Sequence, residues 1–253
     1  MTQRVLVTAG ASGIGREIAR AFSANGAKVF VCDIDSNALD ALAKEVDGLL
    51  TAVCDISKPD DIDRMVSLAL SGLGGLDVLV NNAGISGPTA PVEQIPHDEW
   101  EKVVQVNLNG TFHVTKLAIP HLKKSPAGVI IIMSSIAGRF GYANRSPYST
   151  TKWGLIGFTK TLSIELGQFN IRANAILPGA VEGPRIDRVL EGRAKVSGRS
   201  VGEERESALS TQSLKRFVDP KDIAALAVFL ASDAAKSISG QMIPIDNDAQ
   251  MAS

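Results

Sequence analysis

Short apolar runs alternate with helix-forming segments along the chain, and this alternation narrows the choice of folds more than any other feature. We expect strands at residues 5–8, 28–32, 49–54, 78–80, 129–133, 172–176 and 242–245. We expect helices at residues 14–25, 36–45, 59–70, 98–123, 148–168 and 219–231, with an interruption of the fourth near residue 107. Continuous β-branched runs separated by helices are typical of a parallel sheet that is buried on both faces.

The order of these elements predicts an α/β fold with a doubly wound parallel sheet, in a Rossmann-like three-layer α/β/α arrangement. Right-handed crossovers produce this arrangement, and ligands then bind at the carboxyl ends of the strands. No linker divides the chain, so residues 1–253 are expected to form a single domain. Residues 180–216 break the alternation and are rich in charge, Gly and Ser, which indicates a lid that contains weak helical patterns such as 185–193.

Composition excludes several classes of partner. A net charge of −1 gives no electrostatic argument for binding nucleic acid. No apolar run reaches the ~18 residues of a membrane span, and no cleavable signal pattern opens the sequence, so a cytoplasmic protein is expected. Cys32 and Cys54 are expected to be buried thiols in a reducing cytosol. The three histidines have no metal-ligand spacing, and no metal site is expected.

A glycine-rich turn follows the first expected strand and opens the first helix. Glycine lets the backbone approach a pyrophosphate closely, and the free N–H groups of a helix N-terminus bind anions. The candidate cofactor-binding residues in this turn are Gly10, Ser12, Gly13, Ile14 and Gly15. The alternative is a strand-to-helix turn with a structural role only.

Acidic residues follow the second and third expected strands. Asp33 is eighteen residues beyond Gly15. A carboxylate there can accept hydrogen bonds from both hydroxyls of an adenosine ribose, and it repels a 2′-phosphate. Because no basic residue follows closely, the sequence favours NAD over NADP. Asp55 is a second candidate, for the adenine amino group. The alternative for Asp33 is a helix N-terminal acid, a role that Asp35 or Ser36 could equally serve.

Tyr148 and Lys152 are four residues apart in an expected helix, and Ser135 precedes the tyrosine by thirteen residues. One helical turn stacks the two side chains on one face. A phenol ordinarily has a pKa near ~10, and an ammonium one turn away lowers that pKa toward the working range. The Ser135 hydroxyl could hold a carbonyl oxygen between itself and the phenol. Without other motifs, two solvated helix residues would be the alternative.

Together these motifs resemble those of the classical short-chain dehydrogenase/reductase family, over essentially the whole chain. The resemblance rests on the turn at 8–15, Asn-Asn-Ala-Gly at 81–84, Asn107, Ser135, Tyr148 with Lys152, and Pro-Gly at 178–179. The family is similar in fold to the sheet predicted above. The resemblance implies NAD(P)-dependent interconversion of a secondary alcohol and its carbonyl compound, by a homo-oligomer that is a dimer or a tetramer.

The resemblance also implies catalytic roles. Tyr148 would be the general acid/base, and Ser135 would hydrogen-bond the reacting oxygen. Lys152 would hold the nicotinamide ribose and lower the tyrosine pKa. Asn107 would anchor a water that joins Lys152 to a proton relay, which is plausible because an amide inside a helix can disturb the hydrogen-bond ladder. A simple polar helix residue is the alternative for Asn107.

Further cofactor contacts are implied on the backbone. Asn82 and the backbone near Gly84 would flank the adenosine ribose, although residues 81–84 could instead form a plain turn. Pro178, Gly179 and Val181 would place backbone groups against the nicotinamide carboxamide.

The sequence departs from the family pattern at three places. Ala9 replaces the usual first glycine, which we expect to be tolerated if its φ angle is negative. Gly183 replaces a Thr or Ser that commonly contacts the nicotinamide amide, which puts one hydrogen bond and lid closure in doubt. Asp-Asn-Asp at 246–248 replaces the more usual Asp-Gly-Gly, so packing near a subunit contact is expected to differ.

The sequence says less about the substrate. Six arginines lie between Ser135 and Tyr148 or in and near the lid: Arg139, Arg145, Arg185, Arg188, Arg193 and Arg199. Guanidinium groups suit carboxylates, sulfonates and phosphates, which indicates an anionic or polar hydroxy substrate. The alternative is that these arginines are solvated or paired with nearby acids.

Two other functions stay open on the same residues. One is a non-catalytic NAD(H)-binding sensor or scaffold, since fold alone does not fix function. The other keeps the enzyme but changes the reaction to epimerisation or dehydration through a transient keto intermediate. Intact Asn107, Ser135, Tyr148 and Lys152 favour a dehydrogenase or reductase over a binding protein, which has no chemical need for all four.

Overall fold

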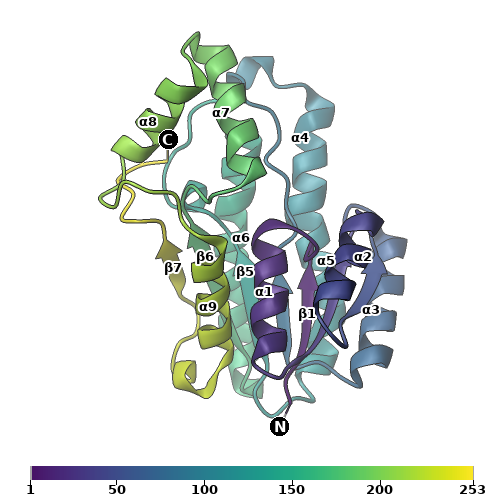
Figure 1. Cartoon of the computed structure of the whole chain (residues 1–253). Coiled ribbons are helices and arrows are strands. Elements are labelled where there is room, and N and C mark those ends of the chain that lie inside the picture. Colours follow the sequence, from purple (N-terminus) through teal and green to yellow (C-terminus); the bar gives the residue numbers. More distant parts are fainter. Residues whose placement is uncertain (1, 253) are drawn as a thin grey trace.

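Seven parallel strands form one sheet, as the sequence predicts, and their order is β3-β2-β1-β4-β5-β6-β7 (Figure 1). A computed structural model describes residues 2–252. The strands are β1 (Arg4–Thr8), β2 (Lys28–Asp33), β3 (Leu50–Val53), β4 (Val78–Asn81), β5 (Val129–Met133), β6 (Arg172–Pro178) and β7 (Met242–Ile245). Every neighbouring pair runs parallel. The doubly wound sheet is therefore confirmed.

Helices connect the strands and cover both faces of the sheet. They are α1 (Gly13–Ala24), α2 (Ser36–Glu45), α3 (Pro59–Leu73), α4 (His97–Val104), α5 (Thr111–Leu122), α6 (Ser146–Leu166), α7 (Pro184–Ser197), α8 (Val201–Ser210) and α9 (Pro220–Ala231). Short 3-10 turns add η1 (Val92–Gln94), η3 (Ile136–Gly138), η4 (Gly167–Phe169) and η5 (Asp233–Ala235).

Alternation of side chains along the strands divides the core in two. Val5 and Val7 of β1 pack with α1, α2 and α9 on one face, whereas Leu6 packs with α3, α5 and α6 on the other. Buried Ile130 and Ile131 of β5 likewise enter opposite clusters. Because successive strand residues point to opposite faces, an uninterrupted apolar run supplies both layers at once.

The strand order reverses between β1 and β4, and this reversal fixes where a ligand can bind. In such sheets the crevice lies beyond the carboxyl ends of the strands on either side of the reversal. The glycine-rich turn follows β1, and the Asn-Asn-Ala-Gly segment follows β4. The topology thus brings together motifs that are seventy residues apart in sequence.

The expected interruption of the fourth helix takes the form of a π-helix, η2 (Gln105–Gly110), between α4 and α5. Its position at Asn107 confirms the sequence prediction. A π-bulge widens the helix by one residue and is frequent at functional sites.

The segment at residues 180–216 contains two helices, α7 and α8, and α7 covers the weak helical pattern expected at 185–193. Figure 1 shows both at the end of the molecule toward which β1 points. Helix α8 starts with a capping box, in which Ser200 and Glu203 satisfy each other's backbone N–H groups. These two helices therefore lie at the sheet end where the crevice is expected.

The described residues contain neither a membrane-spanning helix nor a cluster of side chains suited to a metal ion. No helix within residues 2–252 combines the length and apolarity that crossing a bilayer needs. No cluster of three or more His, Cys, Asp or Glu side chains suited to a metal ion occurs in that same range. Cys32 and Cys54 are free and buried.

Candidate active site

Helix α6 places Tyr148 and Lys152 on one face, as their spacing predicts. The Lys152 Nζ lies 5.5 Å from the centroid of the Tyr148 ring. Helix α6 begins two residues earlier than expected, at Ser146, because Pro147 suits a first turn in which no N–H partner is needed. Lys152 is buried, whereas Tyr148 keeps part of its surface accessible. The phenol can therefore be reached by a ligand.

Ser135 faces the phenol because the turn η3 is docked onto α6. The Ser134 hydroxyl donates to the Lys152 carbonyl oxygen at 2.9 Å, and the Ser149 hydroxyl donates to the Ala137 carbonyl oxygen at 2.9 Å. These two bonds hold the turn on either side of Ser135, whose hydroxyl is close enough to the phenol to lower the pKa of Tyr148. The structure thus brings together the serine and the tyrosine that the sequence paired.

Electrostatics favour the ionised phenol. Burial raises the pKa of Tyr148, but the positive charges of Lys152 and Arg185, the hydrogen bond from Ser135 and the charge of Arg145 together lower that pKa below its ordinary value of 10. An acid whose pKa is lowered toward neutrality transfers protons more readily at physiological pH. The predicted direction of the shift is therefore reproduced, with two arginines adding to the lysine.

Burial is also the main influence on Lys152, whose pKa it lowers to about 8. The tyrosine opposes that shift, and Arg185 adds to it. The ammonium donates a hydrogen bond to the Met133 carbonyl oxygen at 2.8 Å. It is thus fixed beneath the phenol by the last residue of β5.

The side chain of Asn107 braces the loop after β4 against α6. Its Oδ1 accepts from the Ile85 N–H at 2.8 Å, and its Nδ2 donates to the Ile85 carbonyl oxygen at 3.1 Å and to Thr151 Oγ1 at 3.0 Å. A Cβ added at Gly84 would lie 3.2 Å from Asn107 Oδ1 and 3.4 Å from Lys152 Nζ, so these three residues converge. The expected water-anchoring role of Asn107 stays a prediction.

Asn82 holds the glycine-rich turn in place. Its Nδ2 donates to the carbonyl oxygens of Thr8 and Ala9, at 3.1 Å and 2.9 Å. A Cβ at Gly15 would lie 2.5 Å from that Nδ2 and 2.3 Å from the Ala9 oxygen, so only glycine fits there. The Asn82 side-chain N–H groups are thus used within the protein. The expected contact of Asn82 with an adenosine ribose stays a prediction.

The condition under which Ala9 was expected to be tolerated, a negative φ angle, is not met. Ala9 has φ of +50° and Gly13 has φ of +52°. Left-handed backbone costs an L-residue about 1–2 kcal/mol. The Asn82 bond to the Ala9 carbonyl holds this conformation, so the turn keeps its shape without its usual first glycine.

The phosphate-binding candidates lie at the start of α1. Ser12 makes no side-chain cap, and the first-turn N–H groups of a helix have no acceptors within it. The Gly10 N–H, by contrast, is not available to a ligand, since it donates to the Cys32 carbonyl oxygen at 3.0 Å. The N–H groups at residues 13–15 are the ones placed to meet an anion.

Asp33 and Asp55 differ in how they are held. The Asp33 carboxylate accepts from the Ala11 N–H at 3.0 Å, which links β2 to the glycine-rich turn. Asp35, rather than Asp33, caps α2 through the Ala38 N–H, so the helix-acid alternative for Asp33 is excluded. Asp55 is folded into its own turn by Ser57, whose hydroxyl is the main cause of the lowered pKa of Asp55.

The residues expected at the nicotinamide end follow β6. Gly179 packs so closely on Asp246 that a Cβ would lie 2.8 Å from its Cα. Pro178 is the last residue of β6, and Val181 pairs with Val218 in a parallel bridge. Gly183, where a hydroxyl residue is usual, has φ of +133° and caps α7. That backbone angle explains why glycine stands here in place of the usual hydroxyl residue.

The replacement of Asp-Gly-Gly by Asp-Asn-Asp at residues 246–248 also has a conformational basis. Asn247 and Asp248 have φ of +57° and +55°. Asn and Asp are the side chains that best tolerate left-handed backbone, so they replace glycines at little cost. Asn247 donates to the Arg216 carbonyl oxygen at 2.7 Å, which ties this segment to the region after α8.

One contact of the site was not foreseen. A terminal nitrogen of Arg185, on α7, donates to the Gly84 carbonyl oxygen at 3.0 Å. The two residues are 101 positions apart, so no local pattern could have paired them. This bond fastens α7 across the crevice to the loop after β4.

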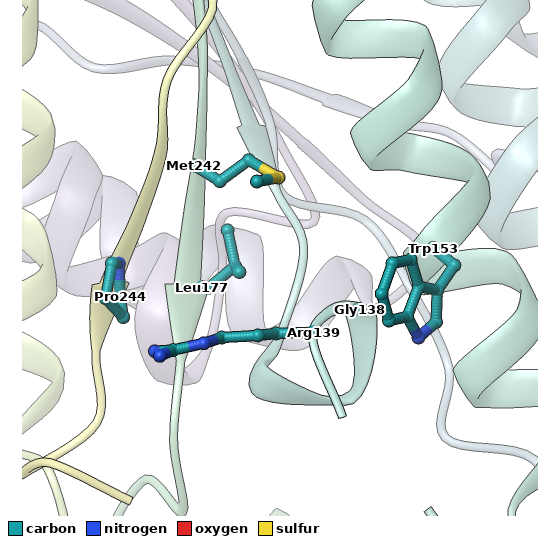
Figure 2. A pocket seen from close by; sticks show the side chains of 6 residues that line it. All are labelled: Gly138, Arg139, Trp153, Leu177, Met242 and Pro244. Atoms are coloured by element: carbon teal, nitrogen blue, oxygen red, sulfur yellow. The ribbon is translucent and has the colours of Figure 1, made fainter. Parts of the chain in front are cut away.

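A surface hollow of about 340 Å³ lies on α6 and β7 instead of at the phenol. Figure 2 shows Trp153 of α6 and Arg139 facing Leu177, Met242 and Pro244. Arg139 stacks 5.0 Å from the Phe140 ring. The structure therefore separates Arg139 from the catalytic candidates with which the sequence grouped it.

Known proteins with similar sequences and structures are oxidoreductases by name. Residues 8–247 match the family model described as enoyl-(acyl carrier protein) reductase. D-beta-hydroxybutyrate dehydrogenase of Cupriavidus necator is 39% identical over 246 residues, which cover 95% of each chain. A variant of actinorhodin polyketide ketoreductase with NADPH superposes with a TM-score of 0.93 at 31% identity, covering 97% of this chain and 96% of that one. NAD+-bound xylitol dehydrogenase does so with a TM-score of 0.92 at 28% identity, covering 96% and 97%.

Proposed function

Because this chain belongs to the short-chain dehydrogenase/reductase family, we propose that it is an NAD-dependent oxidoreductase that interconverts a secondary alcohol and its carbonyl compound. Family membership makes it an enzyme acting on CH–OH groups. The choice of NAD, the type of alcohol and the residue roles are the proposal. Its main support is the convergence of Ser135, Tyr148 and Lys152 at the carboxyl ends of the strands.

The residues of the crevice fit a dinucleotide. The first turn of α1 offers uncapped N–H groups and the positive end of a helix dipole to a pyrophosphate. Gly15 leaves no room for a side chain, so the backbone itself forms the cradle. Asp33, next to this turn, supplies acceptors for a ribose, and Pro178 to Val181 border the nicotinamide end.

The proposed chemistry divides between cofactor and protein. When bound, the nicotinamide ring accepts or donates the hydride. Tyr148 takes the hydroxyl proton in the oxidative direction and returns it in the reductive direction. Ser135 hydrogen-bonds the same oxygen, and the Lys152 ammonium stabilises the phenolate. Asn107 holds the loop after β4 against α6, close to Lys152, through its bonds to Ile85 and Thr151.

The surroundings of Asp33 support NAD over NADP. A carboxylate at this position repels a 2′-phosphate. The next residue, Ile34, is 67% exposed and carries no charge to receive such a phosphate. The solved relatives include both an NADPH complex and an NAD+ complex, so the preference rests on these two residues.

We further propose that the chain works as one domain, with residues 180–216 as its lid. The bond from Arg185 to Gly84 is the latch of that lid. Exposed Phe112 on α5 and Trp153 and Ile164 on α6 support assembly into a dimer or tetramer through these helices. Buried free thiols at Cys32 and Cys54 fit a reducing compartment, and we place the enzyme in the cytoplasm.

The alternative functions gain no support from the comparisons. The relatives described above are all named as dehydrogenases or reductases, which offers nothing for a sensor. Absorbance at the NADH band, screened against sugars, hydroxy acids and secondary alcohols, tests the proposal. Net NADH formation with one alcohol is expected, and it also argues against an epimerase. Tight NADH binding with no turnover across the panel would instead indicate a sensor.

A further inference from the structure

Arg145 is a buried cation that forms no ion pair with a carboxylate among residues 2–252. The residue is 3% exposed, and one terminal nitrogen donates to Thr89 Oγ1 at 2.8 Å. The guanidinium lies 5.4 Å from the centroid of the Tyr148 ring and 5.6 Å from that of Tyr142. Within residues 2–252, its Nε has no hydrogen-bond acceptor, and none of the ion pairs includes it. An unpaired buried charge is costly, so this one calls for a partner.

The charged neighbours of Arg145 are two tyrosines and two further arginines. Arg185 donates to the Gly84 carbonyl oxygen at 3.0 Å, and Arg193 donates to the Tyr142 hydroxyl. Burial lowers the pKa of Arg145 most, Tyr142 and Tyr148 raise it, and the two arginines lower it further, although a guanidinium stays protonated at any physiological pH. The space beside the phenol is therefore bordered by cations.

We propose that Arg145 is the subsite for a carboxylate of the substrate, which makes the substrate a short hydroxy acid or the matching keto acid. The inference rests on the proposed function, since it places the anion beside the reacting hydroxyl. A carboxylate at this position accepts the orphaned Nε–H and supplies the missing countercharge. A planar guanidinium suits this contact because its N–H groups match two carboxylate oxygens.

The distance to the phenol limits the length of the substrate. The guanidinium carbon and the ring centroid are only 5.4 Å apart. An acid group held by Arg145 therefore lies close to the tyrosine that would meet the reacting hydroxyl. This proximity favours a short hydroxy acid over one whose acid group ends a long chain.

A structural role for Arg145 leaves part of the geometry unexplained. Bracing Thr89 needs one donor, which an uncharged glutamine would also provide. The charge of Arg145 also lowers the pKa of Tyr148, but neither role uses the Nε–H, which has no acceptor among residues 2–252. Arg139, in the same loop, stacks on Phe140 and borders the hollow of Figure 2, so it is a matched control.

Malonate binding tests the subsite without any turnover. We expect the protein, saturated with NADH, to bind malonate in equilibrium dialysis at least about tenfold more tightly than neutral malonamide. Arg145→Gln should lose at least about tenfold in malonate affinity, whereas Arg139→Gln should bind as the unaltered protein does. Equal affinity in the Arg145→Gln protein would place the anion elsewhere and overturn the proposal.

A charge-matched substrate pair provides the second test. We expect 3-hydroxybutyrate to exceed 3-hydroxybutyramide in kcat/KM by at least about tenfold. That ratio should fall near one in Arg145→Gln. It should recover partly in Arg145→Lys, which keeps the charge and serves as a second variant if the glutamine substitution impairs folding. Equal kcat/KM for the two compounds in the unaltered enzyme would contradict the subsite.

The two tests separate the subsite from the proposed function. Malonate held by Arg145, together with no turnover of any alcohol, would support the subsite and refute the oxidoreductase assignment. Turnover of neutral alcohols without malonate binding would refute the subsite and support the assignment.

Discussion

The ammonium of Lys152 donates to the carbonyl oxygen of Met133, the last residue of β5, at a distance of 2.8 Å. This bond joins α6, the helix that carries Tyr148, to the central part of the sheet. It also fixes the charge that lowers the pKa of Tyr148. One hydrogen bond therefore couples the core of the fold to the chemistry of the site.

Lys152→Met should remove activity while leaving stability nearly unchanged. The lowering of the lysine pKa to about 8 corresponds to about 3 kcal/mol of unfavourable charge burial at neutral pH. Leaving the Met133 carbonyl without a donor costs about 1–3 kcal/mol. Because these contributions offset each other, we expect kcat/KM to fall by about 10²–10⁴ with Tm moving only a few degrees. A collapse of Tm would show that the lysine is mainly structural.

Tyr148→Phe should reduce kcat by about 10²–10⁴, since it deletes the proton acceptor but keeps the ring. NADH affinity, measured by fluorescence titration, should change little. Tyr142 is the only other tyrosine of the chain, which makes Tyr142→Phe a matched control with less than about tenfold loss. Turnover that survives in Tyr148→Phe would refute the acid/base assignment.

The pH dependence should carry the signature of the tyrosine–lysine pair. Alcohol oxidation needs the deprotonated phenol, so kcat/KM should rise with pH and level off above an apparent pKa that is lower than 10. Carbonyl reduction needs the protonated phenol and should decline through the same range. The midpoint belongs to the coupled pair. Lys152→Met should shift it upward, and an unmoved midpoint would argue against coupling.

The sequence predicted those features of the site that depend on local spacing. Tyr148 and Lys152 share a helical face because four residues make about one turn. The strands were identifiable because buried parallel strands are continuous apolar runs. Helix α8 was missed, although the pair Ser200 and Glu203 forms a capping box whose spacing is visible in the sequence. That motif was the available signal.

Other features depend on contacts between distant residues, which spacing does not encode. In the sequence, either Asp33 or Asp35 could cap the second helix. The structure shows that Asp35 does so, because its carboxylate accepts from the Ala38 N–H. The arginines were a single group in the sequence, and only packing distinguishes buried Arg145 from Arg139. The sequence left the sign of φ at Ala9 open, because the bond that holds its left-handed conformation comes from Asn82, directly after β4.

Asp33→Asn should shift the cofactor preference toward NADP. Asparagine keeps an acceptor for the Ala11 N–H but removes the charge that repels a 2′-phosphate. Hydrogen bonds to charged groups contribute about 1.5–3 kcal/mol, so we expect the NAD/NADP ratio of kcat/KM to fall by about 10–100-fold. Asp35→Asn retains a helix cap and should leave the ratio unaltered. A constant ratio in Asp33→Asn would mean that another group selects the cofactor.

Gly183→Ser tests whether the lid lacks its usual hydroxyl residue for reasons of backbone geometry. Gly183 has φ of +133° and ψ of 178°, a region that is nearly exclusive to glycine and costs other residues about 1–3 kcal/mol. A Cβ there would meet no atom within 4 Å, so any loss must come from the backbone. We therefore expect weaker NADH binding, by about 5–100-fold, and faster proteolysis near α7.

Gly141→Ser is the matched control, since that glycine also has open space and no positive φ, and it should behave as the unaltered protein does. Tighter NADH binding in Gly183→Ser would show that the hydroxyl contact outweighs the strain and that closure of the lid was limited by its absence.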